Sequence, residues 1–206
     1  MLPLSTDVTG LAGIAVTLAA PILAVPGVRR LARPWRALLL TVAGLLVLLP
    51  LGTLPLAVAG RGVTGDLSIT TLVLVGTFLL RNLTGKPAAD SRARFALLAF
   101  VSIAALALYP LALGIGMFDP YRLGFGSPWL LGALFAAAIA AWWRRLDGIS
   151  LCIALATLAW SVRWYESTNL WDYLLDPLVS FFALGYCAVR GAKWILQRFQ
   201  PARPVA

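Results

Sequence analysis

Apolar residues in this chain fall into seven runs separated by short polar stretches. A membrane-spanning helix needs about 20 mostly apolar residues, so each run predicts one span. The expected spans are about 8–28, 37–59, 63–80, 95–117, 128–143, 146–164 and 177–196. The third, fifth and sixth have strictly apolar cores of only about 14–16 residues, which is short for a hydrocarbon core of roughly 30 Å. Flanking side chains or a locally thinner bilayer must compensate.

Threading the chain through these seven runs places most of its basic residues on one side. Fourteen of the seventeen lie there: Arg29, Arg30, Arg33, Arg36, Arg81, Lys86, Arg92, Arg94, Arg144, Arg145, Arg190, Lys193, Arg198 and Arg203. The other side has only Arg61, Arg122 and Arg163. Basic loops stay in the cytoplasm, so the pattern predicts an outside N-terminus and a cytoplasmic C-terminus.

Several predicted helix starts have capping sequences. Ser127 and Asp176 each precede a proline, which is typical of an N-cap followed by the first helical residue. Thr64 or Asp66 is a candidate cap for the third span. The sequence therefore predicts an all-α integral membrane protein. It is a polytopic bundle of about seven transmembrane helices that forms a single domain over residues 1–206.

Composition agrees with a membrane location. Hydrophobic residues make up 61% of the chain, mean hydropathy is +0.88 and 12% of residues are charged. A soluble domain of this size cannot bury so much apolar surface. The net charge of +9 does not indicate a nucleic-acid partner, because the charges flank apolar runs and form no basic domain. The excess of arginine over lysine, 15 to 2, favours a bacterial inner (cytoplasmic) membrane.

Residues suited to catalysis or metal binding are scarce. The chain has no histidine, the commonest metal ligand and the usual base at neutral pH. We therefore expect no metal site, no cofactor and no catalytic residues of these kinds. Cys152 and Cys187 both lie inside apolar runs and indicate no disulfide framework.

The main polar concentration lies in residues 163–176, just before the last span. Its polar residues recur at three- and four-residue steps: Glu166, Asn169, Asp172 and Asp176. This spacing predicts a short amphipathic surface helix. Apolar residues between them, Leu170 and Leu174 among others, are expected to face lipid.

These polar residues define a candidate outer-face polar cluster. Its members are Arg61, Arg122, Arg163, Glu166, Asn169, Asp172 and Asp176. One interpretation is a site for a lipid headgroup or for the basic loop of a partner, with paired carboxylates also able to act as acid and base. The other interpretation is purely structural: Asn169 and Asp172 resemble an N-cap pair, and Asp176 caps the last span.

Three functional hypotheses follow. The first is a non-catalytic accessory or assembly subunit of an envelope enzyme or transporter, in contact with membrane lipid and a membrane-protein partner. The second is a small membrane carrier or lipid translocator that uses its proline-interrupted spans. The third is a membrane-embedded lipid-modifying enzyme that uses outer-face carboxylates.

The many alanines of run 128–143 predict close helix packing, within the chain or against a partner. The sequence does not specify an oligomeric state.

Overall fold

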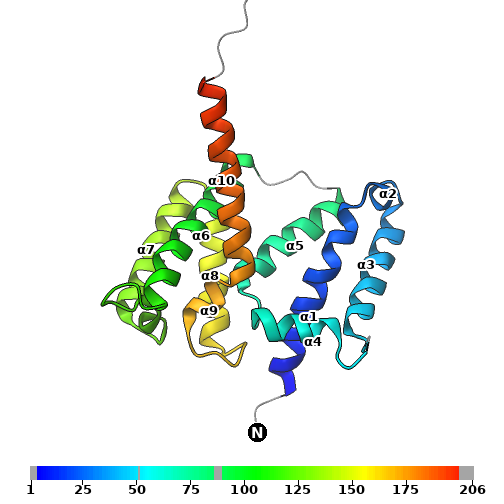
Figure 1. Ribbon diagram of the computed structural model, residues 1–206, viewed down its shortest axis with the longest axis horizontal. Helices are drawn as coiled ribbons and strands as arrows, with labels where there is room; N and C mark the ends of the chain where they lie inside the picture. The colour runs from blue at the N-terminus through cyan, green and yellow to red at the C-terminus, as the bar shows by residue number, and fades with distance from the viewer. Residues whose placement is uncertain (1–3, 51, 86–89, 200–206) are drawn as a thin grey trace, which may run out of the picture.

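The computed structural model describes residues 4–50, 52–85 and 90–199. Leu51 of the predicted span 37–59, and the basic residues Lys86 and Arg203, lie outside these ranges. Helices are the regular elements of this part of the chain, and it contains no strand (Figure 1). The elements are α1 (Leu4–Ala19), η1 (Ala20–Ala24), α2 (Pro26–Arg29), α3 (Arg33–Leu48), α4 (Leu56–Thr64), α5 (Ile69–Thr84), α6 (Ser91–Ala112), η2 (Pro120–Gly124), α7 (Pro128–Trp143), α8 (Asp147–Ser161), α9 (Leu170–Leu174) and α10 (Pro177–Phe199). The predicted all-α class is confirmed.

Helix length and composition support a membrane protein. Three helical segments are long and apolar enough to cross a membrane: Asp7–Ala24, Ser91–Ala112 and Pro177–Arg198. Three further apolar helices are shorter: Ile69–Thr84, Pro128–Trp143 and Asp147–Ser161. A 16-residue helix is only about 24 Å long. The predicted shortness of the third, fifth and sixth runs is therefore confirmed.

The helices form two packed groups with α5 between them (Figure 1). On one side α1 packs against α3 and α4 around a small core with Ile14 and Ala57. On the other side α6, α7, α8, α9 and α10 surround a larger core with Leu98 and Ala156. The connections lie at two opposite ends of the helices. Using the orientation that the sequence predicts, we call the end with α4, η2 and α9 the outer end, and the end with α2 and the C-terminal part of α10 the inner end (Figure 1).

The second predicted span, 37–59, is wrong as one continuous helix. Helix α3 ends at Leu48, and Leu49 is extended with φ −78° and ψ 144°. Proline restricts the preceding residue to extended conformations and itself lacks the N–H that a helix needs. The chain turns between Pro50 and Pro55, and α4 then runs across the outer end (Figure 1).

The start of the third span is also corrected. Helix α5 begins at Ile69, six residues later than predicted, and its N-cap is Ser68 instead of Thr64 or Asp66. The Ser68 hydroxyl accepts a hydrogen bond from the Thr71 N–H. By contrast, α7 and α10 begin at the two prolines that the sequence indicated, Pro128 and Pro177. Proline fits the first turn because that position has no helical partner for an N–H.

The predicted surface helix before the last span is shorter and more buried than expected. Only Leu170–Leu174 is helical. Leu170 is 1% exposed and Leu174 is 4% exposed, and both belong to the larger core. The apolar side of α9 therefore packs against the bundle and not against lipid. Both environments are apolar, so the spacing of the leucines is compatible with either.

Candidate functional site

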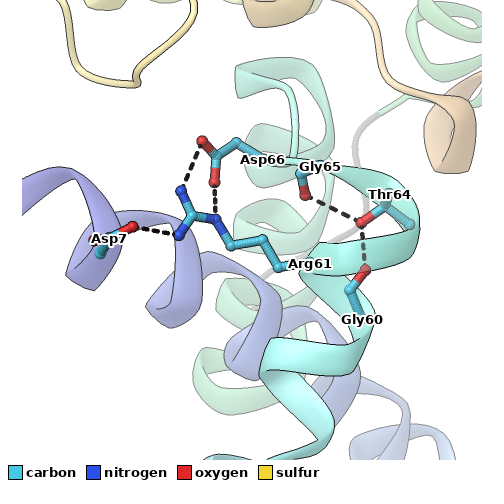
Figure 2. A network of polar contacts seen from close by, with 6 residues as sticks. All are labelled: Asp7, Gly60, Arg61, Thr64, Gly65 and Asp66. Carbon is cyan, nitrogen blue, oxygen red and sulfur yellow. Dashed lines mark hydrogen bonds and ion pairs between the residues drawn. The ribbon is translucent and has the colours of Figure 1, made fainter.

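Arg61 links three parts of the outer end. It lies in α4, its Nε donates a 2.7 Å hydrogen bond to Asp66 Oδ1, and its Nη1 donates a 2.6 Å hydrogen bond to Asp7 Oδ1 in α1 (Figure 2). The hydrogen bonds to Asp66 and then to Asp7 raise the pKa of the Arg61 guanidinium above its usual value. Both ion pairs of the described residues belong to this side chain. Arg61 therefore holds α4 against the start of α1.

Gly10 lets this contact form. A Cβ atom at Gly10 would lie 2.2 Å from Asp66 Oδ1. Only a residue without a side chain allows the Asp66 carboxylate to lie so close to the surface of α1. The sequence placed Arg61 and Asp66 on the same side of the membrane, but it did not pair them with Asp7.

Asp176 joins the starts of two long helices. Its Oδ1 accepts a 2.8 Å hydrogen bond from the Val179 N–H, so Asp176 caps α10 as predicted. Its Oδ2 accepts a 2.8 Å hydrogen bond from the Ser68 N–H and another from the Thr71 hydroxyl, at the start of α5. The side chain is only 3% exposed. A carboxylate held between two helix N-termini is stabilised by their unpaired N–H groups and dipoles.

Asp172 attaches α9 to the η2 loop. The Tyr121 hydroxyl donates one bifurcated hydrogen bond to both of its oxygens, at 3.0 Å each, and Oδ2 also accepts a hydrogen bond from the Ser167 hydroxyl. Burial and the nearby Asp172 carboxylate raise the pKa of Tyr121 to about 12. The Tyr121 hydroxyl therefore stays protonated, and remains a hydrogen-bond donor, across the physiological pH range.

Asn169 and Gly124 complete the contact between these two segments. The side-chain Oδ1 of Asn169 accepts a 2.9 Å hydrogen bond from the Trp171 backbone N–H, which confirms Asn169 as the N-cap of α9. Its amide donates a 2.9 Å hydrogen bond to the Tyr121 carbonyl, and the Trp171 indole donates one of 3.0 Å to the Pro120 carbonyl. A Cβ atom at Gly124 would lie 1.7 Å from Asn169 Oδ1, so this position requires glycine.

The predicted cluster is thus divided among separate contacts. Arg61 binds Asp7 and Asp66, Asp176 binds the start of α5, and Asp172 binds Tyr121. Asn169 is buried and binds the Tyr121 backbone carbonyl, whereas the other members, Arg122, Arg163 and Glu166, are exposed. Arg163 follows the C-cap of α8, Val162, in a left-handed conformation with φ 53°. The expected gathering of the acids of 163–176 around an outer arginine does not form among the described residues.

Sequence reasoning missed the partners of these acids. Ser68 and Thr71 have the spacing of a helix cap, and Gly124 lies in a turn-forming segment, so local signals existed for both. Nothing local indicates that Asp176 meets Ser68, because 108 residues separate them. No group of three or more acidic or cysteine residues suited to a metal ion occurs in the part of the chain that the structure describes.

Comparisons of the chain with protein-family models, with curated proteins and with solved structures give no match. The functional proposal therefore rests on the contacts described above and on the surfaces that the helices leave uncovered.

Proposed function

We propose that this chain is a non-catalytic multi-pass membrane protein that serves as an accessory or assembly subunit, and that α7 is the helix that contacts its partner. The observation that carries the proposal is a row of small residues on α7 that the chain's own helices leave uncovered. Gly132, Ala136 and Ala140 follow one another at intervals of four residues, and all three are exposed. Small residues at this spacing let two membrane helices approach closely.

The row has a defined length. Trp129 and Trp143, 82% and 84% exposed, lie at its two ends on the same face of α7. Tryptophan prefers the two membrane–water interfaces, so the small residues between them fall at bilayer depth. Within 4 Å of a Cβ built at Gly132 there is only open space. The row is therefore exposed along its length, with open space at Gly132.

The other small residues of α7 already pack inside the chain. Ala141 is buried in the larger core, and Ala137 and Ala138 are half-buried against it. The Ser150 hydroxyl of α8 donates a 2.8 Å hydrogen bond to the Ala138 carbonyl, which is a close contact between α7 and α8. The sequence left open whether the alanines pack within the chain or against a partner. The buried face of α7 packs within the chain, and its exposed face is free to pack against a partner.

The outer-end carboxylates support a structural role for that end. Asp66, Asp172 and Asp176 bind donors from other helices or loops of the same chain. These contacts join the loops and helix starts of the outer end to one another, as expected of a scaffold. Transport of a defined solute by the protein in liposomes would instead favour the carrier hypothesis.

A photocrosslinking amino acid at Ala136 is expected to give one discrete protein adduct in native membranes. The matched control is the same substitution at Ala154, an exposed alanine on α8. Ala140→Leu combined with the crosslinker at Ala136 should reduce the adduct to a minor fraction, because a larger side chain separates closely packed helices. An adduct of twice the chain mass identifies a second copy as the partner. Equal adducts at both positions, or none at Ala136, would contradict the proposal.

The proposal includes the seven-span threading with an outside N-terminus. Two reporter fusions test this threading. The basic residues of the inner end support it through the positive-inside rule. We expect a cytoplasm-active reporter to be active when fused after Ala206 and inactive when fused at Arg122, which lies in η2 at the outer end. The reverse result at either position would overturn the threading. If both fusions agree with this expectation, they support the predicted orientation in a bacterial inner (cytoplasmic) membrane.

A further inference from the structure

A groove between α6 and α10 opens at the inner end of the bundle. It has a volume of about 520 Å³, within the roughly 300–1,000 Å³ typical of ligand sites. Ala99 and Ile103 line it from α6, and Cys187 and Gly191 line it from α10. A Cβ atom at Gly191 would meet nothing within 4 Å. Apart from Ser102 and Arg190 its wall is apolar, as a lipid acyl chain requires.

One guanidinium group, that of Arg190, lines this groove, and a second, that of Arg94, contacts Tyr186 one helical turn before Arg190. Arg190 is stacked over the ring of Phe95, with Cζ 4.5 Å from the ring centroid. Arg94 lies over the ring of Tyr186, at 5.6 Å, and its Nη2 is 3.5 Å from the Tyr186 hydroxyl. Arg190 follows Tyr186 by one helical turn, so these two side chains are neighbours on α10. Phe95 and Tyr186 thus hold one arginine each, and Tyr186 is a neighbour of both.

These two cations have no carboxylate partner in residues 4–50, 52–85 and 90–199, where both ion pairs belong to Arg61 at the outer end. Two like charges beside one tyrosine side chain repel each other. An anion between them would relieve that repulsion. Guanidinium groups are also suited to bidentate contacts with phosphate oxygens.

We propose that Arg94, Arg190 and the groove between α6 and α10 form a binding site for one anionic phospholipid. The headgroup phosphate lies on the two guanidinium groups, and one acyl chain lies along Ala99, Ile103 and Gly191. Trp194, on the wall of the groove, marks the level of the membrane interface. Neither the α7 surface nor the orientation of the chain enters this proposal, so it stands apart from the proposed function.

Native mass spectrometry of the protein in mild detergent tests the site. The probes are phosphatidylglycerol, phosphatidylcholine of the same acyl composition, and inorganic phosphate. We expect the intact chain to retain one phosphatidylglycerol with an affinity roughly tenfold or more above that for phosphatidylcholine. Inorganic phosphate at the same concentration should not displace it, because it lacks the chain that fills the groove.

Two sets of variants separate this site from general charge attraction. Arg94→Gln with Arg190→Gln should remove the preference for phosphatidylglycerol. Arg29→Gln with Arg30→Gln removes the same amount of charge from exposed positions at the inner end, and this double variant should keep the preference for phosphatidylglycerol. Gly191→Leu fills the groove, keeps both arginines and should weaken retention of either lipid. Equal losses in the two double variants, no preference in the unaltered chain, or full displacement by inorganic phosphate would each overturn the proposal.

Discussion

Asp176→Ala is expected to lower the free energy of unfolding by about 3 kcal/mol or more, since each unpaired buried donor costs roughly 1–3 kcal/mol. The substitution removes the acceptor of the Ser68 N–H, the Val179 N–H and the Thr71 hydroxyl. Asp176 itself is 3% exposed, so water replaces these bonds poorly. Equilibrium unfolding by sodium dodecyl sulfate in mixed micelles measures the change.

Two effects oppose each other at this position. Burying a carboxylate costs several kcal/mol, so its removal relieves a penalty. The three donors and the two helix N-termini remain, however, and they lose the carboxylate that accepts their hydrogen bonds. We therefore expect the loss of hydrogen bonds to exceed the relief.

Two variants act as controls for Asp176→Ala. Asp176→Asn keeps one carbonyl oxygen and should lose roughly half as much stability. Glu166→Ala removes an exposed carboxylate from the same segment and should change stability by less than about 0.5 kcal/mol. If Asp176→Ala unfolds like Glu166→Ala, the carboxylate does not join α5 to α10.

Gly124→Ala is expected to detach the η2 loop from the segment before α10 and to cost about 2–3 kcal/mol. The new Cβ would lie 1.7 Å from Asn169 Oδ1 and 2.8 Å from Trp171 Cδ1. These atoms belong to side chains that also hold the backbone of residues 120 and 121, so neither can move without breaking a hydrogen bond. Unfolding in mixed micelles and limited proteolysis of the outer loops measure the effect.

The control for Gly124→Ala is the same substitution at Gly62 in α4, where a Cβ meets nothing within 4 Å. Gly62→Ala should be neutral or stabilising by up to about 1 kcal/mol, because alanine favours a helix. Adding Asn169→Ala to Gly124→Ala should recover part of the loss, since contacting positions are not additive. Equal behaviour of Gly124→Ala and Gly62→Ala would show that the two segments do not pack as closely as described.

Both predictions concern the outer end, where the sequence left open whether the polar residues form a binding site or only cap helices. Their contacts instead fix the loops and helix ends of the chain to one another. The surfaces that we propose for partners lie elsewhere: the small-residue face of α7, and the groove between α6 and α10 at the inner end.

The sequence by itself determined the all-α class, the positions of most helices and several of their ends. Apolar run length and proline caps are local properties, so Pro128 and Pro177 marked the starts of α7 and α10 correctly. Pro50 and Pro55 predict a bend in the second span, but the apolar run continues through them, so the sequence does not show that the helix ends at Leu48.

Only the tertiary structure decided which polar groups meet and which way apolar faces point. Leu170 and Leu174 were expected in lipid and lie in the core, because a leucine gains equally from either apolar environment. Asp176 meets Ser68, and Arg61 meets Asp7, across separations of 108 and 54 residues. Such pairs depend on how whole helices pack, and helical periodicity and capping describe only neighbours within one or two turns.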